Sequence, residues 1–166
     1  MATAYRYFRT AEDLWEEAAL FDSTLLIDPE AVEAAIEAAG DDVEARLDVV
    51  VRQLGWAFID HEPVSRQIMK TSLDRWFTSQ TESLDARPVR PGIRNQWNAL
   101  VVRPLRGTLR DDRLDEVVDA LGLVLGTETV LTLVDVLHLS PEAAKDRLLI
   151  TARWILRSGL AEAARP

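Results

Sequence analysis

The chain of 166 residues contains no cysteine and only two histidines, His61 and His138. The lack of cysteine excludes disulfides, thiolate zinc sites and thiol nucleophiles. Positive charge is also scarce, because 19 Lys and Arg residues stand against 28 Asp and Glu residues, for a net charge of −9. This sign of charge excludes a protein whose whole surface binds nucleic acid.

Glycine and proline are few, with seven of each, and they lie between periodic segments. No segment alternates between apolar and polar residues as a half-buried strand does, so the sequence predicts an all-α protein. Its length suits one domain with a core that needs no disulfides or metal for stability. The first residues include Arg6 and Tyr7 where a signal peptide would be apolar, and we therefore predict a cytoplasmic protein.

Capping residues and helix breakers divide most of the chain into predicted helices. The predicted helices start after Thr10, at Asp28-Pro29-Glu30 (closed by Gly40), and after Asp41 or Asp42 (stopped by Pro63). The next two are predicted over residues 64–80 and from Ile93 to Pro104, which should kink or end the helix. Proline and glycine predict a loop over residues 87–92.

The most apolar stretch is a predicted helical hairpin over residues 113–161. Its two helices are connected by Leu137-His138-Leu139-Ser140-Pro141. Its first helix, from Leu114 to Leu137, is apolar on almost every side, which is typical of a helix buried on two faces. A membrane span is the rival interpretation, but Asp119, Glu128 and Asp135 interrupt the stretch and make insertion costly. Ser140 and Pro141 predict a well-capped start for the second helix.

This hairpin carries more apolar surface than one core needs, so we predict that it pairs with a second copy of itself. Gly122 and Gly126 leave a flat strip where another backbone would approach closely. Ile150 and Trp154 lie on a second, partly apolar side of the last helix. The predicted interface residues are Leu121, Gly122, Leu125, Gly126, Leu148, Ala152, Ile155 and Leu156.

Two parts of the chain resemble the TetR family of transcriptional regulators. Ala2-Thr3-Ala4-Tyr5-Arg6-Tyr7-Phe8, followed by Glu12-Asp13-Leu14, is similar to the end of the DNA-recognition helix and its continuation in that family. Gly126-Thr127-Glu128, Leu133-Val134-Asp135-Val136 and the segment from Leu139 to Ala144 resemble the junction between the last two helices of many members.

The resemblance implies a TetR-like fold whose last two helices form a four-helix bundle in a homodimer. Residues 1–10 would be a remnant of the helix-turn-helix, and residues 11–166 the effector-binding and dimerisation domain. The positions that match DNA contacts in the family are Thr3, Tyr5, Arg6 and Tyr7. Because the first two helices of the motif are absent, we expect operator binding only through a complete N-terminal helix-turn-helix.

The resemblance also implies an effector pocket among the middle helices, over residues 43–105. Aromatic walls suit a small hydrophobic or aromatic effector. The residues predicted to line this pocket are Gln53, Trp56, Met69, Trp76, Phe77 and Trp97. The effector would move the helix over residues 11–26 and change the separation of two DNA-reading heads, which must lie roughly 34 Å apart.

Two other functional classes remain open at this stage. The first is a helical homodimer that binds a ligand or a protein and never contacts DNA. The second is an enzyme, but no catalytic motif appears, so we predict no catalytic activity and no cofactor. Asp135 and His138 have the spacing of a metal-binding pair, yet without a second such pair we predict no metal site and expect Asp135 to form hydrogen bonds near the helix junction.

Overall fold

A computed structural model describes residues 27–78 and 92–165, and the regular elements of these two ranges are helices. The all-α prediction is therefore confirmed. The α-helices are α2 (Pro29–Ala38), α3 (Val43–Val50), α4 (Ala57–Asp60), α5 (Glu62–Thr78), α6 (Ile93–Val102), α7 (Asp111–Val124), α8 (Thr127–Leu131) and α9 (Pro141–Ala163). Two π-helical segments, η2 (Val51–Trp56) and η6 (Thr132–Val136), and one 3₁₀ segment, η5 (Arg103–Leu105), continue these helices.

The predicted capping residues begin their helices as expected. The carboxylate of Asp28 accepts hydrogen bonds from the backbone N–H groups of Glu30 and Ala31, and Asp42 does the same at the start of α3. Ser140 caps α9 by accepting from the N–H of Ala143 at 3.3 Å. Each such cap is worth about 1 kcal/mol. Gly40 has a φ of 65°, a left-handed conformation that ends the α2 region at little cost in glycine.

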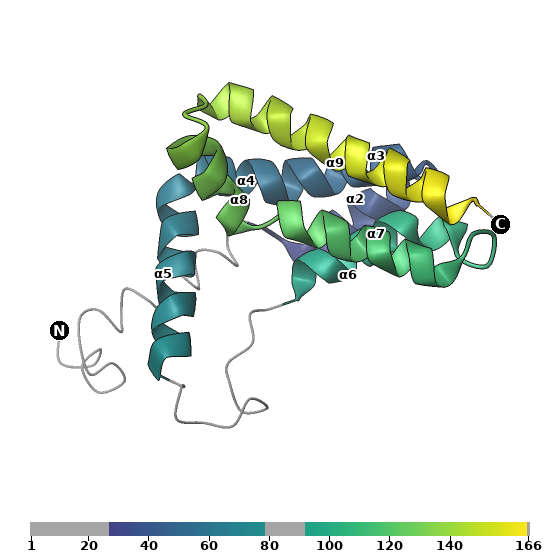
Figure 1. The fold of residues 1–166 in the computed structure, drawn as a ribbon, viewed down its shortest axis with the longest axis horizontal. Helices are drawn as coiled ribbons and strands as arrows, with labels where there is room; N and C mark the ends of the chain where they lie inside the picture. Colours follow the sequence, from purple (N-terminus) through teal and green to yellow (C-terminus); the bar gives the residue numbers. More distant parts are fainter. Residues whose placement is uncertain (1–26, 79–91, 166) are drawn as a thin grey trace.

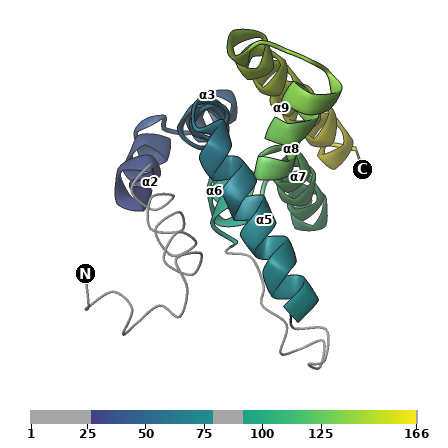
Figure 2. The ribbon, with the colours of Figure 1, turned by 90° about the vertical axis from the view of Figure 1, so that its left-hand side faces the viewer.

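The helices form layers, with α3 and α6 in the middle. Helix α2 packs on one side of this pair, and α7 and α9 lie on the other side (Figure 2). Helices α7 and α9 run antiparallel along one edge of the molecule (Figure 1). Helix α5 packs on α8 and extends away from the layers.

The hydrophobic core runs through the layers from α2 to α9, and part of it lies where α9 meets its neighbours. The buried residues of α9 fall on one face at helical spacing: Ala144, Leu148, Ala152, Leu156 and Ala163. Gly55 of η2 lets Leu148 come close, because a Cβ on Gly55 would lie 2.5 Å from Leu148 Cδ2. Gly159 of α9 similarly allows close contact with Val117 of α7. Small residues on facing helices therefore bring α9 close to η2 and α7 at once.

The predicted helix from Leu114 to Leu137 is wrong as one continuous element. It breaks at Leu125 and Gly126, and the part from Thr127 to Val136 turns by 48° relative to α7. The physical reason lies at Gly126, whose backbone is extended and whose missing side chain leaves room for the ion pair between Arg94 and Glu128. A side chain at this position would clash with both partners of that pair.

The prediction that Gly122 and Gly126 present a flat strip to a partner is also corrected. Both glycines are buried within the chain. The side chain of Asn95 from α6 fills the space beside Gly122, so this glycine serves the packing of α6 on α7.

Several predictions concern residues that the structure does not describe. The helix predicted after Thr10, the DNA-contact residues Thr3, Tyr5, Arg6 and Tyr7, and the loop over residues 87–91 lie outside the described ranges.

Within residues 27–78 and 92–165, no single helix is long and apolar enough to cross a membrane. Helix α7 and the segment Thr127–Val136 meet that length and composition only when taken together as a bent pair.

One buried cation joins three parts of the middle layers. Arg46 of α3 is 3% exposed. Its guanidinium donates to the carbonyl of Gly40 at 2.5 Å, to the carbonyl of Leu100 at 2.7 Å and to the carboxylate of Glu37 at 3.3 Å. It therefore satisfies backbone carbonyls after α2 and within α6 that have little access to water.

We predict that Arg46→Ala lowers the free energy of unfolding by about 3 kcal/mol, because two carbonyls lose charged donors in a buried site. Urea denaturation followed by circular dichroism measures the change. Arg103→Ala is the matched control, since Arg103 also pairs with Glu37 but is exposed, and its loss should cost less than about 1 kcal/mol. Equal effects of the two substitutions would contradict the structural role given to Arg46.

Candidate functional site: the outer groove between α7 and α9

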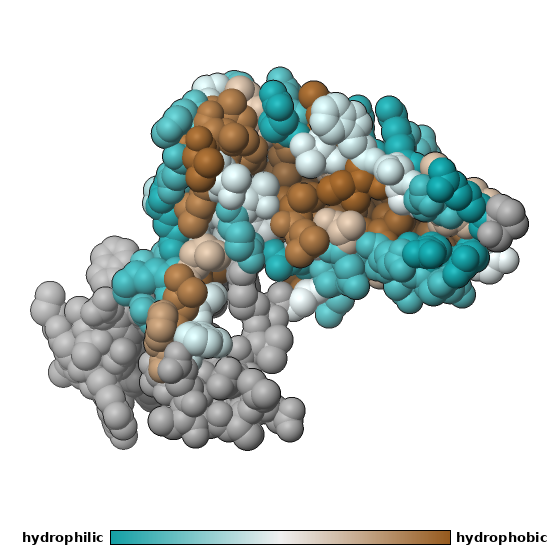
Figure 3. All heavy atoms as spheres, viewed as in Figure 1, coloured by the Kyte–Doolittle hydropathy of each residue, from teal (hydrophilic) through white to brown (hydrophobic). Residues whose placement is uncertain are grey.

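A groove runs along the outer face of the α7–α9 pair, on the side away from the middle layer. Its volume is about 500 Å³. The lining residues are Arg113, Glu116, Val117 and Ala120 from α7, and Trp154, Ile155, Ser158, Gly159 and Glu162 from α9. Figure 3 shows hydrophobic residues along the seam between the two helices, with hydrophilic residues toward the end where the chain's C terminus lies.

Large apolar side chains extend this face beyond the groove. Trp154 is 63% exposed, and Ile150, one turn earlier on α9, is 44% exposed. Leu123 follows Ala120 by one turn of α7 and is 80% exposed. Contiguous apolar surface of this kind typically marks an interaction site, because covering each such side chain contributes about 1.5–3 kcal/mol.

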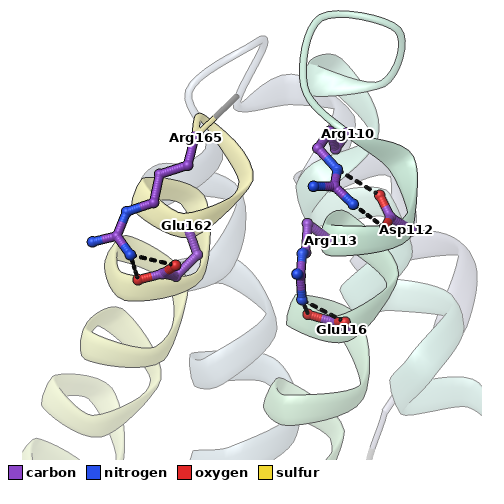
Figure 4. Close-up of polar contacts among 6 residues, drawn as sticks. All are labelled: Arg110, Asp112, Arg113, Glu116, Glu162 and Arg165. Atoms are coloured by element: carbon purple, nitrogen blue, oxygen red, sulfur yellow. Dashed lines mark hydrogen bonds and ion pairs between the residues drawn. The ribbon is translucent and has the colours of Figure 1, made fainter.

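Charged side chains of both signs surround the end of the groove. Arg113 pairs with Glu116 on α7, and Arg165 pairs with Glu162 on α9, each through oxygens at 2.7–2.8 Å (Figure 4). Arg110 and Asp112 form a further pair at the start of α7, and the hydrogen bonds from Arg110 lower the pKa of the Asp112 carboxyl. Exposed pairs contribute little to the stability of one chain, so they can exchange partners when another surface arrives.

The predicted dimer-interface residues do not line this outer face, with one exception. Seven of them are buried in the core of the chain itself: Leu121, Gly122, Leu125, Gly126, Leu148, Ala152 and Leu156. Only Ile155 lines the groove. The prediction of these seven as partner contacts is therefore corrected. The surplus apolar surface exists, but Leu123, Ile150 and Trp154 carry it.

The sequence predicts Ile150 and Trp154 on a second, partly apolar side of the last helix, and it contains a signal that would also have found Leu123. Glycine at 126, after a long apolar stretch, permits a helix break. With α7 ending there, Leu121 faces inward, and Leu123, two residues on, falls on the opposite side of the helix.

The residues predicted to line an effector pocket belong to η2, α5 and α6. Trp97 belongs to the core at 1% exposure, and its indole N–H donates to Glu33 at 3.3 Å. Trp76 and Phe77 are exposed on α5, where their rings contact edge to face at 5.0 Å. Met69 is half-buried on α5, and Gln53 is exposed on η2.

Two cations contact the ring of Trp56, the sixth residue predicted for the pocket, at the surface of η2. Arg52 stacks on its ring, and Lys145 of α9 approaches the same ring. Among the residues that the structure describes, none accepts a hydrogen bond from its buried indole N–H.

Asp135 forms an ion pair that joins α5 to η6, as its predicted hydrogen-bonding role requires. Arg66 of α5 donates to both carboxylate oxygens, at 3.0 and 2.5 Å, and also to Glu62 at 2.8 Å. His138 follows in the joint before α9 with a φ of 53°. Over the described residues, no three His, Cys, Asp or Glu side chains come together as metal ligands.

Neither a family model nor a curated protein nor a solved structure matches this chain.

The Arg66–Asp135 pair predicts a pH-dependent contribution to stability. The hydrogen bond from Arg66 lowers the pKa of Asp135 below 3.8. A lowered pKa in the folded state stabilises the protein above the unfolded value, and this contribution is lost as the pH falls through the folded value. We therefore expect Asp135→Asn to lower the urea midpoint at pH 7, and the difference from the parent protein to disappear in strong acid.

Asp146→Asn is the matched control for this measurement. It removes the same charge from an exposed carboxylate that has no ion-pair partner among the described residues. A pH-dependent difference of the same size in this variant would attribute the effect to net charge and contradict the role of the pair.

Proposed function

We propose that this chain is the dimerising and effector-binding part of a TetR-type transcriptional regulator. The observation that carries the proposal is the exposed apolar groove on the last two long helices, α7 and α9. A two-fold dimer formed through this face would join four antiparallel helices in one bundle, which is the arrangement that the family resemblance implies. The junction from Gly126 to Ala144 carries the matching sequence segments.

The chemistry of the face supports a second copy as its partner. A two-fold interface brings the same patch of both copies together, so each Trp154 would meet the seam of the other copy. Arg113 and Glu162 line opposite walls of the groove, on α7 and α9. Charges of both signs on one patch allow each copy to offer cations where the other offers carboxylates.

In this proposal the dimer interface fixes the relative orientation of the two effector-binding domains. An effector bound on the middle helices would favour one arrangement of α5 and the chain before α2, and the interface would transmit the difference to both copies. The Arg66–Asp135 pair joins α5 to the element that leads into α9, so it lies on this route. Operator contact needs the complete helix-turn-helix.

We predict that Trp154→Glu converts the dimer to a monomer. Two copies would each place a carboxylate in an apolar seam, and the dissociation constant should rise by at least about a hundredfold. Sedimentation velocity at micromolar concentration measures the oligomeric state, and circular dichroism checks that the variant folds.

Leu73→Glu provides the matched control, because Leu73 is also exposed but belongs to α5. It should leave the dimer intact. A parent protein that sediments as a monomer, or an equal loss of dimer in both variants, would refute the interface.

Operator binding needs its own experiment, in which the chain is extended by the sequence encoded directly upstream of Met1. A gel shift on DNA from around its own gene should show a specific complex with the extended form and none with the 166-residue chain. If the extended chain dimerises but shifts no DNA, the function is that of a dimeric ligand- or protein-binding module.

A further inference from the structure

A row of ion pairs fastens α9 to α3 on the side away from the groove. Arg157 pairs with both oxygens of Glu44 at 2.8 and 2.7 Å. One turn along, Arg153 pairs with Asp48, with Nε at 2.9 Å from the carboxylate. Glu44 and Asp48 are four residues apart, and the next position at this spacing, on η2, is Arg52. A cation therefore stands where a third carboxylate would continue the row.

Arg52 has no carboxylate partner among the described residues, in a chain where acids outnumber bases. Its guanidinium instead stacks on Trp56, with Cζ 4.5 Å from the ring centroid. A second cation reaches the same ring, since Lys145 Nζ lies 5.7 Å from the centroid. Lys145 is also paired with Asp60 at 2.5 Å, so the cluster of Arg52, Lys145 and Asp60 keeps one net positive charge.

Two features of the backbone place Arg52, Trp56 and Lys145 close together: the π-helical segment η2 and the glycine at position 55. Arg52 and Trp56 belong to η2, and π-helical turns inside helices occur frequently at functional sites. Gly55, between them in sequence, admits Leu148 and so lets α9 approach closely enough to place Lys145 beside the indole. The buried indole N–H of Trp56 has no acceptor within residues 27–78 and 92–165, and an unpaired buried donor costs about 1–3 kcal/mol.

We infer that Arg52, Trp56 and Lys145 form a binding site for a small oxyanion, a carboxylate or a phosphate. The guanidinium of Arg52 is exposed and offers paired N–H donors that match the oxygens of either group. Lys145 is the second cation against the ring, and because Asp60 balances its charge, Arg52 supplies the net positive charge of the site. The site lies at the surface, where a ligand enters without opening the core. This anion site is separate from the α7–α9 groove and does not depend on dimerisation.

Nuclear magnetic resonance of the full chain tests the inference through the indole N–H signal of Trp56, assigned by its loss in Trp56→Phe. The protein is titrated with sodium phosphate and, separately, with sodium acetate, at constant pH and with sodium chloride holding the ionic strength constant. We expect the Trp56 signal to shift and saturate with at least one of the two anions. The anion that saturates identifies the ligand group as phosphate or carboxylate.

The matched variants are Arg52→Gln and Arg147→Gln. Both remove one exposed arginine that has no ion-pair partner among the described residues, so neither breaks a salt bridge. Arg52→Gln should weaken anion binding by at least about tenfold, whereas Arg147→Gln should leave it unchanged. Arg52→Lys keeps the charge without the forked donors and should bind with intermediate affinity.

Two results would overturn the anion site. One is a shift that grows linearly with both anions, which indicates screening without a site. The other is an equal loss of binding in Arg52→Gln and Arg147→Gln, which attributes the effect to net charge. A circular dichroism spectrum identical to that of the parent confirms that each variant is folded before its titration is interpreted.

Discussion

The packing of α9 against two other helices at once is the constraint on which the rest of the structure depends. Its buried face, from Ala144 to Leu156, touches the α3–η2 helix and α7 together. Such close packing is possible only because glycines at positions 55 and 159 remove side chains from the two contacts. Because α9 contacts α7 on one side and the α3–η2 helix on the other, one face of α9 remains exposed. This face is bounded by one edge along α7 and another along α3.

The two edges of α9 have opposite chemistry, and this difference gives the molecule two separate surfaces. Toward α7, apolar side chains remain uncovered around Trp154, and burial of that surface needs a partner. Toward α3, arginines meet carboxylates, and the row continues to the cations around Trp56. An apolar surface favours association of large areas, whereas a charged site with an aromatic wall suits a small ligand.

The break at Gly126 decides which apolar residues serve the core and which serve the surface. A single helix from Leu114 to Leu137 would have presented one continuous apolar stripe along its whole length. Leu121 is buried and Leu123 is 80% exposed because they lie on opposite sides of α7, and Leu125 is buried where the chain turns by 48°. The residues predicted as a dimer interface thus became the core of one chain, and the dimer hypothesis now depends on a different set.

The sequence by itself determined the helical class and most helix ends, because these depend on local interactions. Asp28, Asp42 and Ser140 cap the backbone within three residues, and Gly40 and Pro141 act through their own φ angles. Tertiary structure alone decided which apolar face turns inward and which side chains meet. The Arg94–Glu128 pair over Gly126, and Lys145 beside Trp56, join residues distant in sequence, and neither periodicity nor spacing contains that information.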